Sequence, residues 1–510
     1  MHHIITLTAK RLSDGQERII YLSDRGLTNA PSGAPANQIF EPRLIEPLGG
    51  RFDMFDRLTT YGGTNTGLAE LRINNNDGVF DWLLTDYTVN GGEVRVYIGD
   101  ESASVFPTQF QLVQLCRAVL ATADDKEIRV EIRDKIKLFD KPLLPNKYLG
   151  NNALPVGTEG TKDDLKDRRK PRVYGKVENI APYYVNTSRL IYQVSDRQCT
   201  VNAVYSRGVA WASDGTYAAF ADLQNDALEP AQSKYKVYSG SEGTYFRLGS
   251  VPAGTVTCDA QTADILAGDL LEQIALDMGV SLSDISATDV AALNAIGYDC
   301  GVWATEEMTG LQALNEIASS VGAYCRFDGF GVLRLQRLTP PNVSHSFDVP
   351  PWLIVDLKLI KTADTDEGVP AWRVNLKYRK NYTVQDDLGD TAATARAAFA
   401  SEEYRIAKAE NATTKTIYED SPEVEIITSL IDETDAQAEA ARYLSLLGQQ
   451  RFVYEITMGA GKPSDISGVS IGDTVRVTYP RFNLSAGKNF RVIGIVYNVG
   501  QNVITLRLWG

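Results

Sequence analysis

The side chains best suited to covalent or metal chemistry are scarce in this sequence. The chain has 510 residues, among them five cysteines and three histidines. The cysteines are scattered, odd in number and never form a C-x-x-C pair, which argues against a disulfide framework, a zinc site or an iron-sulfur cluster. We expect buried thiols. They are Cys116, Cys199, Cys258, Cys300 and Cys325.

Histidine offers one candidate for nucleophilic catalysis. His2 and His3 lie at the start of the sequence, where we expect a mobile end. A Ser-His-Asp or Cys-His site would therefore have to use His345, which follows a linker-like PPNVS segment at residues 340–344. We predict a surface or interface histidine at this position.

Two acidic segments have ligand types that could suit a metal ion. Residues 74–78 (NNNDG) carry Asn and Asp side chains, but the Glu at the twelfth position of a calcium loop is missing. The second segment holds Asp364, Asp366 and Glu367 before Gly368. The first pattern is typical of a turn and the second of a solvated hairpin end. We predict no metal site and no cofactor.

No catalytic motif occurs in a supporting context. The sequence lacks a phosphate-binding G-x-x-x-x-G-K-[ST] loop, a dinucleotide-binding G-x-G-x-x-G, a zinc-binding H-E-x-x-H and a nucleophile elbow G-x-S-x-G in such a context. Paired carboxylates for glycoside hydrolysis cannot be located, because 65 acidic residues offer many pairs and the separation that matters is spatial. We predict that the protein is not an enzyme.

Composition narrows the class further. The net charge is −14, with 51 basic and 65 acidic residues, which weighs against a nucleic-acid binder. The basic run at residues 166–172 (KDRRKPR) has no interleaved aromatic residue, so we expect a solvated loop or a subunit contact. No window reaches about eighteen apolar residues and no signal peptide is recognisable, so we expect a protein without a transmembrane span that folds in a cytoplasm.

The elements that would position any site are mostly strands. Residues 469–510 form three runs of alternating apolar residues, separated by turns at Gly487 and Gly500. Residues 91–132 show the same order of elements: a Val-Arg-Val strand preceded by glycine, a second apolar strand, a polar turn and a third alternating strand. We infer one β-module used twice. Its candidate strand positions are Val94, Val96, Ile128, Val130, Val475, Val477, Val492 and Leu506.

Helical periodicity appears between and within these β regions. At residue 263 the apolar period changes from two to near 3.6, which predicts a helix over residues 263–279. A second helix is predicted over residues 306–321, with Thr305 as N-cap, followed by a hairpin around residues 328–331. An Ala-rich helix is predicted over residues 391–409. A last helix should follow Thr434, with Gln437 completing a capping box.

Several segments resemble known proteins when read in order. They include NNNDGVFDWL at 74–83, GGEVRV at 91–96, IRDKIKLFDKPL at 132–143, PRVYGKVENIAP at 171–182 and YFRLGSVPAG at 245–254. Similar segments recur in the same order in baseplate hub and tail-tip hub proteins of long-tailed bacteriophages and in hub proteins of gene-transfer-agent particles. The resemblance runs over most of the chain. None of its motifs is a catalytic signature.

The resemblance gives the domains their expected identity. We predict a mainly β, multi-domain fold with α+β insertions. Residues 1–140 would be a first tube-type β-barrel module, 141–262 a linker and inserted β-rich domain, 263–338 an α+β helix-hairpin domain, and 339–510 a second tube-type β-barrel module with two helices.

The function implied is that of a structural virion protein. A homotrimer with two modules in each chain would present six modules, which lets a threefold tip mate with a sixfold tail tube and line the channel for viral DNA in transit. Expected partners are distal tail or tail tube proteins and tail-tip or central fibre proteins, in a virion assembled in the host bacterial cytoplasm, without stable membrane insertion. An acidic channel wall would repel DNA and let it pass.

The alternative is a cell-surface carbohydrate-binding or peptidoglycan-degrading tail component. Such a protein would carry exposed clusters of Trp and Tyr, and the 6 tryptophans and 24 tyrosines show no useful clustering in the sequence.

Overall fold

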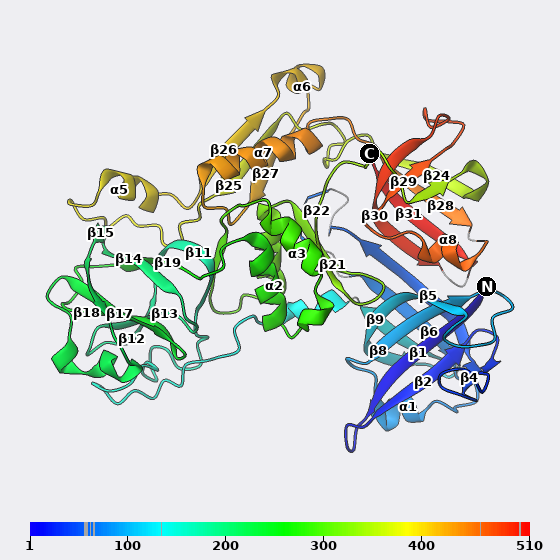
Figure 1. Ribbon diagram of the computed structural model, residues 1–510, viewed down its shortest axis with the longest axis horizontal. Helices are drawn as coiled ribbons and strands as arrows, with labels where there is room; N and C mark the ends of the chain where they lie inside the picture. Colours follow the sequence, from blue (N-terminus) through cyan, green and yellow to red (C-terminus); the bar gives the residue numbers. More distant parts are fainter. Residues whose placement is uncertain (56–59, 62, 65–66, 134, 460, 499–500) are drawn as a thin grey trace.

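The computed structural model describes residues 1–55, 60–61, 63–64, 67–133, 135–459, 461–498 and 501–510. The fold is mainly β, as predicted. One large sheet lies at one end of the long axis and holds strands from both ends of the chain (Figure 1). A region of two smaller sheets lies at the other end, with helices between them and the large sheet. The predicted turn residue Gly500 falls outside the described residues.

The N-terminal part of the large sheet runs in the order β5-β6-β10-β9-β8-β1-β2-β4-β3, with β7 paired to β1. Alternating burial along these strands places their apolar side chains in one core. The strands are β1 (His2–Arg11), β2 (Glu17–Ser23), β3 (Leu27–Thr28), β4 (Ile39–Pro42), β5 (Leu44–Asp53), β6 (Leu68–Asn74), β7 (Tyr87–Thr88), β8 (Glu93–Gly99), β9 (Phe110–Ala123) and β10 (Glu127–Arg133). Helix α1 (Trp82–Thr85) and the 3-10 helix η1 (Lys135–Asp140) accompany them.

The C-terminal part continues the same sheet in the order β24-β28-β31-β30, and β30 pairs with β5. Strand β29 pairs with both β30 and β23. The strands are β23 (Phe347–Val349), β24 (Ile354–Lys361), β28 (Val453–Gly459), β29 (Thr474–Val477), β30 (Lys488–Asn498) and β31 (Val503–Trp509), with η5 (Pro351–Leu353) and helix α8 (Pro463–Ser467).

The prediction of two closed barrels is wrong for the described residues. The path of paired strands ends at β24 on one side and at β3 on the other, so the sheet does not close. The N-terminal part curls, because β5 also contacts β1 and β2. It stays open because β5 gives its outer edge to β30.

Residues 172–304 supply two five-stranded sheets, ordered β15-β14-β19-β11-β20 and β12-β13-β18-β17-β16, which share an apolar core. Their elements are β11 (Arg172–Ile180), β12 (Tyr183–Asn186), β13 (Ile191–Ser195), β14 (Thr200–Ser206), β15 (Val209–Ala210), β16 (Ala212–Thr216), β17 (Lys234–Gly240), β18 (Gly243–Leu248), β19 (Val256–Gln261), β20 (Gly301–Ala304), η2 (Phe220–Gln224) and η3 (Asp226–Leu228).

The basic run at residues 166–172 was expected to be a solvated loop or a subunit contact, and its first three residues are exposed, but its last residue is not. Arg172 is buried and holds Asp196 through two hydrogen bonds of 2.6 and 2.7 Å. It also donates to Asp277 at 3.1 Å. Burial makes this residue a structural cation inside the chain, which the sequence alone did not reveal.

The central helices and hairpin are α2 (Ala267–Asp277), η4 (Leu282–Asp284), α3 (Ala287–Asn294), α4 (Gly310–Ser320), β21 (Ala323–Phe327) and β22 (Leu333–Arg337). Helix α4 begins later than predicted, and Thr309 replaces Thr305 as N-cap. The Thr309 hydroxyl accepts from the N–H of Gln312, and the Gln312 side chain accepts from the N–H of Thr309. This capping box fixes the start of the helix.

A three-stranded sheet ordered β26-β25-β27 packs against α7 and lies above α2 and α3 in the view of Figure 1. Its elements are β25 (Arg373–Tyr378), β26 (Arg405–Glu410) and β27 (Glu423–Ile427), with α5 (Thr394–Ala400), α6 (Ala412–Ile417) and α7 (Glu433–Leu447). No helix in the described ranges is long and apolar enough to cross a membrane.

Two helix predictions in this region need correction. The Ala-rich segment forms a helix only over Thr394–Ala400, and its second part is strand β26, because Ala407 and Ala409 turn inward beneath helix α7. Helix α7 is capped by Asp432, whose carboxylate accepts from the N–H of Thr434. Gln437 does not complete a box, since its side chain donates to the carbonyl of Lys408.

Candidate functional site

The eight candidate strand positions all lie in strands of the large sheet. Each side chain is fully buried, with an exposed fraction of 0%. Val94 and Val96 belong to β8, Ile128 and Val130 to β10, Val475 and Val477 to β29, Val492 to β30 and Leu506 to β31. They are core residues of the two sequence repeats, and their part in a tube stays a prediction.

The two repeats have the same strand order. In the first, β6 leads through α1 to the meander β8-β9-β10, and β10 pairs back onto β6. In the second, β28 leads through α8 to the meander β29-β30-β31, and β31 pairs back onto β28. An earlier strand covers the outer edge of each, β5 on β6 and β24 on β28.

The register of the two meanders is also the same. The ladder between β9 and β10 skips Val119, and the ladder between β30 and β31 skips Ile493. Each skipped residue is a bulge that bends its strand. Arg117 and Arg491 lie two residues before the respective bulges.

This register aligns the two Val-Arg-Val segments that the sequence singled out. Arg117 is opposite Glu93, the residue before the first segment, and Arg491 is opposite Thr474, the residue before the second. A one-residue slip would reverse every side chain in the strand. The equal register therefore supports the correspondence inferred from the sequence.

A single ladder joins the two repeats. Strand β5 pairs antiparallel with β30, from Asp53 opposite Gly494 to Gly49 opposite Asn498. The N–H of Met54 extends the ladder by donating to the carbonyl of Ile493 at 2.8 Å. One edge of β30 is thus divided, its first part pairing with β29 and its second part with β5.

An ion network crosses this junction on the polar face of the sheet. Asp53 accepts from Arg507 of β31 across Gly494, and Arg51 donates to the other oxygen of Asp53 at 2.5 Å. Arg507 lies 3.6 Å from Glu455. The side chains of Asp53 and Arg507 are only 6% and 9% exposed. A Cβ at Gly494 would lie 2.2 Å from the Asp53 Oδ1 atom, so glycine leaves the space that this pair uses.

The rest of the polar face carries paired charges of both signs. Arg72 and Arg129 both donate to Glu127, at 2.7 and 2.6 Å, and Arg72 holds the pKa of Glu127 below its usual value. Strand β8 adds an Arg95–Glu93 pair at 2.6 Å. Each of these pairs neutralises the charges that it contains.

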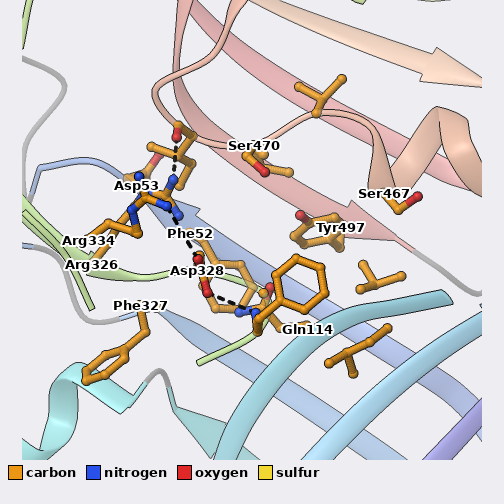
Figure 2. Close-up of a pocket in the computed structure, with 18 residues that line it drawn as sticks. Phe52, Asp53, Gln114, Arg326, Phe327, Asp328, Arg334, Ser467, Ser470 and Tyr497 are labelled. Atoms are coloured by element: carbon orange, nitrogen blue, oxygen red, sulfur yellow. Dashed lines mark hydrogen bonds and ion pairs between the residues drawn. The ribbon is translucent and has the colours of Figure 1, made fainter. Parts of the chain in front are cut away.

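A cavity of about 180 Å³ lies beside the junction, between β5, β9, β30 and the β21–β22 hairpin (Figure 2). Asp328 accepts from the N–H groups of Phe330 and Val332 and shapes the hairpin turn. Arg326 donates to the carbonyl of Ile471 at 2.7 Å. Burial raises the pKa of Tyr497 to about 12, so the phenol stays protonated. These side chains serve packing and turn formation.

The histidines differ from expectation at the start of the chain. His2 and His3 are buried in β1 and are not on a mobile end. His3 Nδ1 lies 2.6 Å from Asp24 Oδ2, and His2 Nε2 lies 2.9 Å from the Ser23 hydroxyl. Burial disfavours the charged Asp24, but hydrogen bonds from His3 outweigh it and lower the pKa of Asp24.

His2 does not form a catalytic triad with these neighbours, because its Nδ1 atom faces the carbonyl of Ala103 at 3.2 Å and no carboxylate. His345 pairs with Asp348 at 3.1 Å and is partly exposed.

The cysteines are all buried, as predicted. Burial raises the pKa of Cys199 to about 11 and that of Cys300 to about 12. These thiols are protonated near neutral pH and make poor nucleophiles.

The first acidic segment forms the predicted turn. The Asp77 carboxylate receives two hydrogen bonds of 2.8 Å from Arg43, and Asn74 accepts from the N–H of Asn76. The second segment is not a fully solvated end, because Asp364 is 0% exposed and accepts from the N–H and hydroxyl of Thr60. Burial raises the pKa of Asp364 to about 7 despite these bonds. Over the described part of the chain, no three His, Cys, Asp or Glu residues are grouped for a metal.

No protein-family model and no curated protein matches the chain. Solved structures with similar chains include a tail protein from Neisseria meningitidis MC58, at 11% identity over 100% of this chain and 96% of that one, with a TM-score of 0.43. The 43 kDa tail protein of prophage MuSo2 from Shewanella oneidensis is 8% identical over 99% and 98%, with a TM-score of 0.45. A chain of a native gene transfer agent particle is 15% identical over 73% and 91%, with a TM-score of 0.42. These are tail and virion proteins, the class that the sequence resembles.

Proposed function

We propose that this chain is a structural component of a phage-type tail tip, a hub that assembles as a homotrimer at the end of a tail tube. One observation carries the proposal: two modules with equal strand order and register are joined edge to edge by the β5–β30 ladder. The sequence resemblance to tail hubs points in the same direction.

A duplicated module would allow a threefold assembly to match a sixfold tube. Three chains with two modules each supply six similar modules, so a trimer can contact a sixfold tube at every position of its ring. A closed ring requires the same interface to recur around it. The β5–β30 junction is one such interface already formed inside a single chain.

In this hub the polar face of the large sheet lines the channel. Its arginines and carboxylates are paired, as in Arg72–Glu127 and Arg507–Asp53. A wall of paired charges presents few free cations to the phosphates of passing DNA, so DNA slides without being held. In this proposal neutralised pairs, rather than an excess of acid, keep the wall from holding DNA. Tail tube or distal tail proteins would contact one rim of the ring and tip or fibre proteins the other.

The proposal is tested by the mass and shape of the purified full-length chain. Light scattering after size exclusion should give three times the 56.0 kDa chain mass, and electron microscopy should show rings with six similar lobes. A monomer at every concentration would refute the hub. Clearing of peptidoglycan in a zymogram would refute the purely structural role.

A further inference from the structure

The outer edge of β24 is open in the described part of the chain. β24 pairs with β28 on one side, and no described strand pairs with its other side. Several of its apolar side chains are exposed, among them Val355 at 69%, Leu359 at 37% and Ile360 at 38%. Unpaired N–H and C=O groups beside exposed apolar residues form a template for another strand.

A second open edge lies at the end of β9. Strand β8 pairs with β9 only as far as Arg117. Asn90 then donates through its side chain to the carbonyl of Val119 at 2.8 Å, and the edge of residues 120–123 continues beyond it without a described partner strand. Leu120 in this edge is 53% exposed.

These two edges correspond to the two strands that already pair at the junction. The strand order makes β24 the counterpart of β5, and the equal registers of the meanders make the end of β9 the counterpart of the end of β30. The two edge strands differ in their bulges, since β5 is regular from Gly49 to Arg51 and β24 has a bulge between Leu359 and Lys361. The carbonyl of the bulged residue accepts a hydrogen bond in both places. The Ile493 carbonyl accepts from the backbone N–H of Met54, and the Val119 carbonyl accepts from the side-chain amide of Asn90. A chain thus carries one filled junction and both halves of a second one.

We propose that β24 of one copy of the chain pairs antiparallel with residues 120–123 of β9 in the next copy, repeating the β5–β30 junction between chains. This contact rests on the proposed hub and names the surfaces that would close its ring. The occupant of each open edge is therefore a second copy of the same chain.

The register of the filled junction predicts which residues meet. Tyr497 lies opposite Gly50 in the junction, and their counterparts are Ala123 and Leu359. In the filled junction the large Tyr497 of β30 faces the small Gly50 of β5. In the proposed contact the small Ala123 of β9 faces the large Leu359 of β24. The volume that the contact must fill is therefore similar in the two interfaces.

Charge also favours this partner. In the same register Asp124 lies opposite Lys358, and Asp125 continues the acidic end of the β9–β10 turn. The Lys358 side chain is 62% exposed and lies beside Asp356 in its own strand. Opposite charges across paired strands stabilise the pairing.

Crosslinking of the full-length chain tests this pairing. Ala123→Cys and Leu359→Cys are combined in one chain and treated with a short bismaleimide. The five native thiols are buried and serve as a low background. A link within one chain leaves its mass unchanged, whereas a link between copies doubles or triples the mass on a denaturing gel, so the gel distinguishes the two.

The double variant should run as covalent dimers and trimers on a denaturing gel, while each single variant and the Arg95→Cys, Leu359→Cys control run as one chain. Light scattering distinguishes a failure of this strand pairing from a failure of the proposed hub. A three-chain mass without crosslinks overturns this pairing and leaves the hub intact. A monomeric mass at every concentration overturns both.

Discussion

Asp53 and Arg507 connect the two halves of the large sheet, and their pairing gives a measurable test of the junction. The change is a double-mutant cycle of Asp53→Asn, Arg507→Met and the combined variant. Breaking a buried ion pair by removing one partner costs about 3–5 kcal/mol. Each partner here keeps a second contact, Asp53 with Arg51 and Arg507 with Glu455. We therefore expect about 2–3 kcal/mol for each single change and a coupling of about 2 kcal/mol.

Hydrogen exchange of the β5 and β30 amides is the suitable assay, because it reports local opening in a chain too large for two-state unfolding. A single change should speed exchange of the Met54 amide by about 30-fold, and the double variant should be little worse than either single one. The matched control is the exposed Arg95–Glu93 pair, where the coupling should stay near about 0.5 kcal/mol. Additive effects of Asp53→Asn and Arg507→Met would refute the coupling.

Three further predictions follow from single residues. The pKa of Asp364 is about 7 in the folded chain, above its unfolded value, so the free energy of opening around this carboxyl should fall by about 3 kcal/mol as the pH rises from about 4 to 7. Hydrogen exchange of the Thr60 amide, which donates to Asp364, should show the fall, and Asp364→Asn should remove it. Gly494→Ala should open the junction in hydrogen exchange by about 2–3 kcal/mol, and it should not add to Asp53→Asn because both remove the same contact. Thr309→Ala should weaken protection of the first turn of α4 by about 1 kcal/mol, whereas an equal effect of Thr305→Ala would contradict the assigned cap.

The repeated module was the part of the fold that the sequence made predictable. In both Val-Arg-Val segments the two valines are buried and the arginine between them is not, and this alternation indicates the register. Glycines and short polar segments marked the turns. Local signals of this kind need no knowledge of distant parts of the chain.

The junction was not predictable by the same reasoning. Strand β5 has two register irregularities and contains Pro47, Gly49 and Gly50, which obscure its strand character in the sequence. Its partner β30 lies at the other end of the chain. Likewise the Ala-rich segment has helical propensity, but packing under α7 makes residues 405–410 a strand, because tertiary context overrides propensity.

The buried polar residues were missed for a related reason. Asp364 and Arg172 occur in segments that look like solvated loops, and only the folded chain brings Thr60 to the first and Asp196 to the second. A sequence pattern indicates whether a segment is polar or apolar. It does not show which distant residues lie beside that segment in the folded chain.

The β5–β30 junction can form only after both of its strands have been synthesised. Strand β5 is translated well before its partner β30, because residues 54–487 separate the two strands. At roughly 5–20 residues per second, the β5 edge waits on the order of half a minute without its ladder. Pro47, Gly49 and Gly50 make this edge a poor template for wrong partners during the wait. A chain that stops before residue 488 would keep the edge open, so the pairing reports that β30 has been made.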